Sequence, residues 1–278
     1  MKYFGFLVRF VVLPLLLLRF LAWRDQRRGK VLPSSMGSWS EEAVLLGHVA
    51  VAVAYTTPWD NYLVANGVWS YNPDLVTGLT LGYVPIEEYT FFVLQSLLTG
   101  SWTHYLARRM KAEASSLTAQ QTLMPRLAAT AGLGILWVAG MRRLLASENK
   151  DDYLGLIVGW ALPPIMFQTA FGGDILWRNR ALIAASILPA TAYLGVSDSL
   201  AIGSGTWQIN PENTIKTEVI KNLPFEELLF FLLTNVLLVF GITLVQSKES
   251  ENRLPAFIRP AYDRWKARMQ NERLSGQS

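Results

Sequence analysis

Seven apolar stretches, each close to the length of a membrane span, dominate this 278-residue chain. A bilayer core needs about 20 apolar residues per helix, and a span must satisfy its backbone polar groups internally. The stretches lie at roughly 3–22, 41–57, 85–106, 124–145, 153–172, 180–197 and 224–245. Only 17% of the residues are charged, against about 25% in soluble domains. The predicted fold class is therefore all-α, a polytopic membrane helix bundle of about seven transmembrane helices.

Basic residues alternate between the connections and predict the orientation. They gather after the first, third, fifth and last stretches, whereas the loop from Thr57 to Val84 has none. Cytoplasmic loops carry the excess of Lys and Arg. We therefore expect a multi-pass protein of the cell membrane with its N-terminus outside and its C-terminus in the cytoplasm. Three residues on the predicted outer side oppose this assignment: Arg142, Arg143 and Lys150.

The chain contains an internal repeat. P-I-E-E-Y-T-F-F, from Pro85 to Phe92, returns as P-F-E-E-L-L-F-F, from Pro224 to Phe231. Upstream of these, G-V-W-S-Y-N-P matches G-T-W-Q-I-N-P, and an aspartate precedes each copy: Asp60 with Trp69, and Asp198 with Trp207. Equivalent spans are offset by four along the chain, an even number, so the two repeats are expected to be parallel and to face each other across a central cleft. The expected parts are a first repeat at 1–123, a linking span with the second repeat at 124–247, and a basic tail at 248–278. The tail forms either an interfacial helix around 260–269 or a partly disordered segment.

Each repeat carries two adjacent glutamates, Glu87 with Glu88 and Glu226 with Glu227. A proline at the first helical position would place them in the first helical turn, where acidic residues favour the helix dipole. That ordinary interpretation explains one glutamate well, but it does not explain a pair that occurs twice before a Phe-rich span. Ionisable groups in membrane segments are costly and indicate function. We expect one glutamate to be a general acid and another carboxylate to be the matching base.

An acid and a base in an aromatic, lipid-facing cleft suit an apolar polyene. Protonating an alkene generates a carbocation, which aromatic faces stabilise by about 2 kcal/mol or more when water is excluded. For any single ring, ordinary helix packing is the simpler interpretation. The candidates that line the pocket are Trp69, Trp207, Phe91, Phe92, Phe230 and Phe231.

The motifs resemble those of the membrane lycopene cyclases of the non-flavin type. These occur as paired small subunits in some bacteria and as the cyclase half of the fungal bifunctional cyclase/phytoene synthase. The resemblance covers roughly residues 40–245. It runs through W-D-N-Y, W-S-Y, G-Y-V-P-I-E-E-Y-x-F-F, A-I-G-x-G-T-W, L-P-F-E-E-x-x-F-F and N-V-x-L-V-F-G.

The resemblance implies lycopene β-cyclase activity, which converts the ψ ends of lycopene to β-ionone rings through γ-carotene to β-carotene. This is an isomerisation without net redox change. A glutamate would protonate C2, the C5=C6 bond would close on the cation at C1, and a carboxylate would remove the proton from C6. By their match to the family motif, the expected catalytic residues are Glu87, Glu88, Glu226 and Glu227, with Glu87 and Glu226 ranked first. Asp60 and Asp198 are expected as proton relays or orienting groups, or else as polar helix-end contacts.

The sequence also predicts which cofactors and partners the protein uses. No G-x-G-x-x-G follows a strand, so FAD is not expected. The chain has no Cys, and its two His lack ligand spacing, so no metal site is expected. The expected partners are lycopene, membrane lipid and other enzymes of carotenoid biosynthesis, without nucleic acid.

Two alternative functions stay open. One is cyclisation of a different polyene, such as a C50 carotenoid, because chain length is selected by pocket shape. The other is a proton-coupled transporter of small molecules, which parallel repeats with carboxylates would also suit. The position of the glutamates at helix starts and the aromatic motif count against the transporter.

Overall fold

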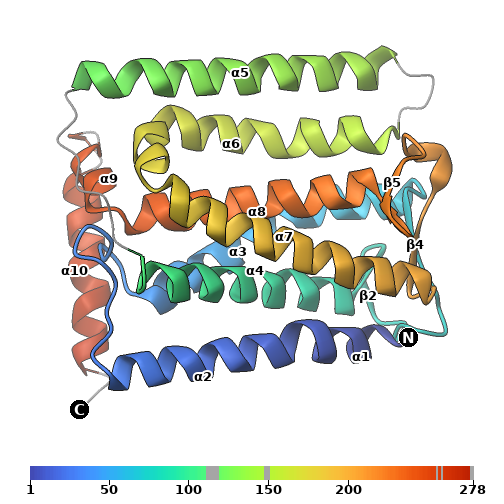
Figure 1. The fold of residues 1–278 in the computed structure, drawn as a ribbon, viewed down its shortest axis with the longest axis horizontal. Coiled ribbons are helices and arrows are strands. Elements are labelled where there is room, and N and C mark those ends of the chain that lie inside the picture. The colour runs from blue at the N-terminus through green and yellow to red at the C-terminus, as the bar shows by residue number, and fades with distance from the viewer. Residues whose placement is uncertain (111–118, 147–150, 255, 258, 276–278) are drawn as a thin grey trace.

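The computed structural model describes residues 1–110, 119–146, 151–254, 256–257 and 259–275. Its long helices lie side by side in one bundle, with the N-terminus and the short strands at one end and the C-terminus at the other (Figure 1). The long helical segments are α1 (Tyr3–Leu7), the π-helical η1 (Val8–Val12) and α2 (Leu13–Arg27) in one run, then α3 (Glu41–Ala65), α4 (Ile86–Ala107), α5 (Ala119–Ala146), α6 (Tyr153–Arg178), α7 (Arg180–Gly203) and α8 (Phe225–Gln246). Two further helices, α9 (Lys248–Asn252) and α10 (Arg259–Ser275), follow them.

Helices occupy the seven predicted stretches. Several of these helices extend beyond the apolar residues into the polar sequence that follows. Among the described residues, five helical segments are long and apolar enough to cross a membrane: Tyr3–Arg27, Leu123–Ala146, Tyr153–Arg178, Arg180–Gly203 and Phe225–Gln246. The helices α3 and α4 do not reach the same hydropathy. In α4 the polar side chains Gln95, Thr99 and His104 are buried, so this helix presents polar groups to the bundle interior. The fold is thus a mostly helical bundle with five candidate membrane-spanning helices.

The first turns of the helices follow from local sequence. The Ser40 hydroxyl caps α3 by accepting the backbone N–H of Ala43, and Asp152 caps α6 by accepting that of Gly155 at 2.9 Å. The prediction of proline at the first helical position is wrong by one residue. Pro85 and Pro224 occupy the N-cap positions of α4 and α8, with extended backbone angles. Each proline also ends a short strand, so the helix begins only at the following residue.

Short strands, which the sequence analysis did not predict, fasten the two loops that carry the motifs. We call these the first motif loop (66–85) and the second motif loop (204–224). Strand β1 (Trp69–Tyr71) pairs antiparallel with β4 (Trp207–Ile209), so that Ser70 faces Gln208. Within the loops, β2 (Thr80–Leu81) pairs with β3 (Val84–Pro85), and β5 (Glu218–Ile220) pairs with β6 (Leu223–Pro224). The β1–β4 pairing therefore joins the two loops directly.

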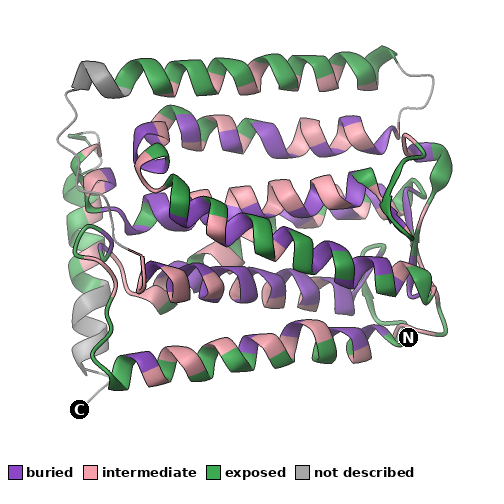
Figure 2. Ribbon diagram, viewed as in Figure 1, coloured by how far each residue is buried: buried purple, intermediate pink, exposed green. Residues whose placement is uncertain are grey.

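The motif helices are central and α5 is peripheral. Figure 2 shows α4 largely buried and α5 largely exposed. Helix α8 packs against α6, α7, α3 and α4, whereas α5 packs against α6. The main apolar core lies near the strand end of the bundle and contains Tyr3, Phe6, Leu63 and Tyr153.

Charged residues divide between the two ends of the bundle. Arg108 pairs with Glu41 and Arg109 with Asp25, all at the end that carries α9 and α10. At the strand end, the Arg143 Nη2 lies 2.8 Å from Asp152 Oδ1. This basic residue, which opposed the predicted orientation, is therefore neutralised by a local partner. Lys150, which opposed it as well, lies outside the described residues.

Candidate active site

One glutamate of each pair anchors a motif loop. The Oε1 atom of Glu87 accepts the backbone N–H of Thr77 at 2.7 Å, and Oε1 of Glu226 accepts that of Ile215 at 2.6 Å. Both glutamate side chains are buried. The two hydrogen bonds are equivalent in the two repeats, and each ties a loop to the start of the following helix. Neither Glu87 nor Glu226 lines the cavity described next.

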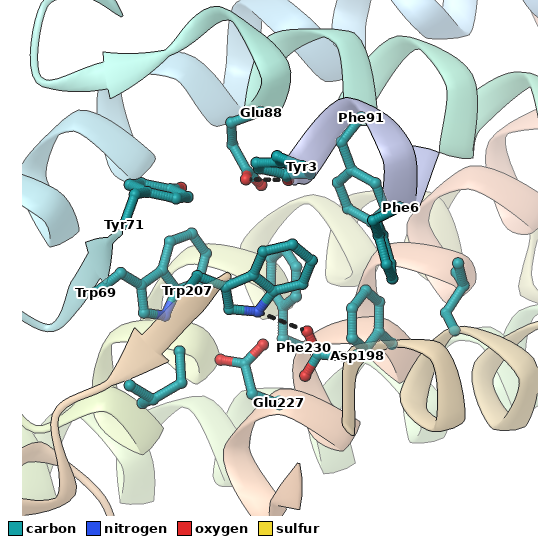
Figure 3. Close-up of a pocket in the computed structure, with 13 residues that line it drawn as sticks. Tyr3, Phe6, Trp69, Tyr71, Glu88, Phe91, Asp198, Trp207, Glu227 and Phe230 are labelled. Carbon is teal, nitrogen blue, oxygen red and sulfur yellow. Dashed lines mark hydrogen bonds between the residues drawn. The ribbon is translucent and has the colours of Figure 1, made fainter. Parts of the chain in front are cut away.

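The other glutamate of each pair faces a shared cavity. Glu88 on α4 and Glu227 on α8 are both almost fully buried and approach the cavity from opposite sides, with aromatic side chains between them (Figure 3). Consecutive helical residues point about 100° apart, so a glutamate that faces a loop leaves its neighbour facing the bundle. The cavity encloses about 30 Å³. Its walls are formed by Tyr3, Phe6, Trp69, Tyr71, Glu88, Phe91, Leu194, Asp198, Trp207, Ile209, Glu227, Phe230 and Phe231.

The two aspartates lie close to these glutamates but differ in their contacts. Asp198 lines the cavity and accepts the indole N–H of Trp207 at 2.9 Å. Asp60 is fully buried but does not line the cavity, and neither of its carboxyl oxygens has a hydrogen-bond partner among the described residues. Both aspartates interact electrostatically with Glu88 and Glu227. Four carboxyls thus form one buried cluster.

Aromatic rings separate this cluster from the rest of the bundle. Of the six predicted aromatic residues, five line the cavity, and Phe92 is buried outside it. Phe91 and Phe231 meet edge to face with ring centroids 6.3 Å apart, and Trp69 meets Phe230 at 5.7 Å. Rings from both repeats therefore surround the carboxyls.

Several cavity residues were missed by the sequence analysis. Tyr3 and Phe6 come from the N-terminal helix, far from either motif, and the Tyr3 hydroxyl donates a hydrogen bond to Glu88 Oε2. Tyr71 lies within the first motif loop, where its hydroxyl is beside Glu88. Burial, followed by the nearby carboxyls of Glu88 and Asp60, raises the pKa of the Tyr71 hydroxyl well above its ordinary value. No local pattern marks Tyr3, although a tyrosine, Tyr153, also stands at the start of α6.

Within the ranges that the structure describes, no three His, Asp or Glu side chains are grouped so that they could hold a metal ion. Whether the protein needs a cofactor stays a prediction of the sequence.

The helices and the cavity together define a class of protein: a helical bundle with five candidate membrane-spanning helices among the described residues and buried carboxyls at an aromatic cavity. The lycopene cyclase family model matches residues 2–106 and 153–245 of this chain. The chain therefore belongs to the lycopene cyclase family. The matched ranges end before α5 and resume after it, so the peripheral helix lies outside the family pattern.

Individual relatives agree with this assignment. The chain is 40% identical over 196 residues to a lycopene beta-cyclase of Halobacterium salinarum, covering 70% of this chain and 79% of that protein. It is 35% identical over 199 residues to a bifunctional lycopene cyclase/phytoene synthase of Colletotrichum graminicola, covering 70% of this chain but only 34% of that protein. A bifunctional protein of the same name from Sporisorium reilianum is 32% identical over 228 residues, covering 76% of this chain and 32% of that protein. No solved structure matches the chain.

Proposed function

We propose that this protein is a lycopene β-cyclase that converts the ψ ends of lycopene to β-ionone rings. Family membership supports the proposal, as does the name of the Halobacterium salinarum relative, most of whose length is covered. The chain corresponds to about a third of the fungal bifunctional proteins. No phytoene synthase activity is proposed.

The observation that carries the proposal is the meeting of Glu88 and Glu227 in one aromatic cavity. They come from the two copies of the motif and from different helices, yet both are nearly fully buried. Cyclisation needs a proton donor and a proton acceptor on the same end group. Two carboxyls on opposite sides of a small apolar space meet that need.

The reaction is an isomerisation without redox change. One carboxylic acid gives its proton to C2, which leaves a cation at C1. The C5=C6 double bond attacks C1, a C1–C6 bond forms, and the cation moves to C5. The opposite carboxylate removes the proton from C6, so that a C5=C6 double bond results. One proton has been added and one removed, and the product has the composition of the substrate.

The aromatic lining suits the cationic intermediate. The faces of Trp69, Trp207 and Phe230 attract positive charge more strongly where water is excluded. The cavity volume of about 30 Å³ leaves room for only a water molecule or two and is too small for a ten-carbon end group. Lining side chains must therefore move aside when the substrate binds.

The remaining predicted site residues receive different roles. Glu87 and Glu226 position the motif loops through their backbone contacts. Each turnover moves one proton from the acid to the base, and this proton must return before the next turnover. Asp60 and Asp198, which interact with both Glu88 and Glu227, are placed to relay it.

We also propose seven transmembrane spans with two parallel repeats: the first repeat at 1–123, a linking span with the second repeat at 124–247, and a cytoplasmic tail at 248–278. Equivalent contacts in the two halves support the repeats. Glu87 and Glu226 each accept a backbone N–H from their own motif loop, and the equivalent strands β1 and β4 pair with each other. The proposed orientation places the strand end outside and the α9–α10 end in the cytoplasm of a cell-membrane protein. Other enzymes of carotenoid biosynthesis are proposed partners, since they make lycopene and consume its products.

Expression in bacteria that accumulate lycopene tests the function. The cells should turn from red to orange, and chromatography should show γ-carotene and β-carotene. Unchanged lycopene with the protein present in the membrane would refute the cyclase and favour the transporter. Supplying C50 carotenoid precursors in parallel tests the alternative substrate, because preferential conversion of these would replace lycopene as the substrate.

A further inference from the structure

The first helical turn of the chain, which begins at Tyr3, reaches into the cavity. Tyr3 is 1% exposed, and its hydroxyl donates a hydrogen bond to Glu88 Oε2. In Figure 3 the Tyr3 ring lies directly beside the Glu88 carboxyl, on the side of the cavity opposite Glu227. The N-terminal helix thus supplies a donor to one of the two carboxyls proposed for acid–base chemistry.

Contacts to both motif loops hold Tyr3 in place. Its backbone N–H donates to Leu75 O at 2.9 Å in the first loop, and Thr206 Oγ1 in the second loop donates to Met1 O at 2.6 Å. The Tyr3 ring packs between Tyr71 and Trp207, with centroid distances of 6.3 and 4.7 Å. A ring held by two aromatic neighbours and at its backbone can keep its hydroxyl pointing in one direction.

The second repeat lacks this contact. Tyr153 stands at the start of α6 as Tyr3 stands at the start of α1, and it is fully buried beside Glu227. Its hydroxyl interacts with the Glu227 carboxyl but is not close or aligned enough for a direct hydrogen bond like that of Tyr3 with Glu88, and the Glu227 Oε1 atom has no hydrogen-bond partner within the described part of the chain. The indole N–H of Trp69 also lies near Glu227 without completing a hydrogen bond. The two glutamates therefore occupy unequal surroundings.

The difference has a chemical consequence. A hydrogen bond donated to a carboxyl oxygen stabilises the ionised form. A buried carboxyl oxygen without a donor is unfavourable when ionised, so the neutral acid is the favoured form. Glu88 is thus arranged as a proton acceptor, and Glu227 is arranged as a proton donor.

We propose that Tyr3 is a positioning residue that holds Glu88 as the proton acceptor of the cyclisation, with Glu227 as the proton donor. The inference rests on the proposed cyclase function. In the reaction, the Glu227 O–H bond breaks as the C2–H bond forms, and Glu88 takes the C6 proton after C1–C6 closure. Tyr3 keeps its own proton throughout.

The position of the acceptor selects the ring. Loss of the C6 proton from the C5 cation gives a β ring, loss of a C4 proton gives an ε ring, and loss of a proton from the C5 methyl gives a γ ring. A carboxylate held in one place removes one of these protons. A carboxylate that has lost its fixed partner reaches more than one of them.

The substitution Tyr3→Phe tests this role because it removes the hydroxyl and keeps the ring between Tyr71 and Trp207. We expect Tyr3→Phe to lower the total cyclised product and to raise the fraction of ε and γ rings severalfold. The matched control is Tyr193→Phe, since the Tyr193 hydroxyl holds the same N-terminal segment through Phe10 O at 2.9 Å and touches no carboxyl. Tyr193→Phe should keep the wild-type ring ratio.

The outcomes separate the inference from the function. Wild type that makes no cyclic product overturns the cyclase itself. Active wild type with an unchanged ring ratio in Tyr3→Phe overturns the role of Tyr3, and a changed ratio in Tyr153→Phe instead reverses the assignment of donor and acceptor. If Tyr3→Phe fails to reach the membrane, Glu88→Asp serves as the second test. Its shorter side chain draws the carboxylate away from the Tyr3 hydroxyl, so this variant must give the same altered ring ratio.

Deuterium provides the closing measurement. In D₂O, Glu88→Gln retains the donor, so lycopene recovered from it should carry deuterium at the end group through reversible protonation. Glu227→Gln should return lycopene without deuterium. Exchange in Glu227→Gln and none in Glu88→Gln would overturn the proposal.

Discussion

Trp207 donates its indole N–H to Asp198 Oδ1 at 2.9 Å inside the cavity. The equivalent indole nitrogen of Trp69 has no hydrogen-bond partner among the described residues, and neither does the equivalent carboxyl, Asp60. The two halves of the site share residue types but differ in their hydrogen bonds. A chemically asymmetric reaction, with one proton given and another taken, can use such a difference.

The first prediction concerns this hydrogen bond. A hydrogen bond contributes about 0.5–1.5 kcal/mol, and about 1.4 kcal/mol corresponds to a tenfold change in rate. Trp207→Phe should therefore slow lycopene conversion by up to roughly tenfold in isolated membranes. Trp69→Phe, which loses no hydrogen bond, should slow it less. An equal loss of rate in the two variants would show that the Trp207 ring, and not its hydrogen bond to Asp198, supports the reaction.

The second prediction separates the two glutamates of each pair. Gln keeps an oxygen that can accept a hydrogen bond but cannot supply or take the catalytic proton. Glu88→Gln and Glu227→Gln should abolish cyclisation, while Glu87→Gln and Glu226→Gln should keep most of it. Product chromatography at equal membrane levels measures this. Loss of cyclisation in Glu87→Gln would place that residue in the chemistry.

The third prediction concerns the loops that Glu87 and Glu226 hold. Ala removes the acceptor of the Thr77 or Ile215 backbone N–H, and the loss of one such hydrogen bond costs about 0.5–1.5 kcal/mol. Glu87→Ala and Glu226→Ala should therefore lower the melting temperature of the purified protein, whereas the Gln variants should not. Equal melting temperatures for Ala and Gln would show that these hydrogen bonds do not stabilise the loops.

The fourth prediction concerns Gly82, which has a φ of +69° in the first motif loop. A Cβ atom there would lie 2.1 Å from Asn61 Oδ1, the atom that accepts the backbone N–H of Tyr83. Gly82→Ala should therefore destabilise the protein by more than the roughly 1 kcal/mol of the backbone strain alone. Gly67→Ala is the control, because Gly67 has the same φ with no atom within 4 Å. Thermal unfolding that ranks Gly67→Ala as the more damaging would contradict the role of Asn61.

The fifth prediction is a pH effect on the tail. Glu251 pairs with Lys266 and accepts the Tyr262 hydroxyl at 2.6 Å. Partial burial would raise the pKa of Glu251, but Lys266 and Tyr262 outweigh it, so that the pKa is lowered from its ordinary value of 4.5. A lowered pKa stabilises docking of α10 at neutral pH, and this contribution is lost as the pH falls through the lowered value.

Protease cleavage of the tail measures this docking. Cleavage should be slow at neutral pH and should rise as the medium becomes more acidic than pH 4.5, the ordinary value for glutamate, with an acid-stable protease. Glu251→Gln should show faster cleavage at neutral pH with little further change on acidification. An unchanged pH response in Glu251→Gln would assign the effect to another group.

Local sequence predicted the helices well because each apolar stretch must hydrogen-bond its own backbone in lipid. The seven predicted stretches are helical, and the helices extend past the predicted boundaries where polar residues follow, as at the end of α3, which ends at Ala65 and not at the predicted residue 57. The duplicated motif also predicted that carboxyls and rings of both halves would be candidates for one site. Of these candidates, three carboxyls and five aromatic rings line the cavity: Glu88, Asp198, Glu227, Trp69, Phe91, Trp207, Phe230 and Phe231.

The sequence by itself determined the helices and the duplicated set of carboxyls and aromatic rings. Only the tertiary structure decided which member of each glutamate pair faces the cavity, because the rotation of α4 and α8 depends on helix packing and on the loop hydrogen bonds of Glu87 and Glu226. It also brought Tyr3 to Glu88 across most of the first repeat. Side-chain contacts between distant segments depend on the sum of many packing interactions, which no local pattern of residues records.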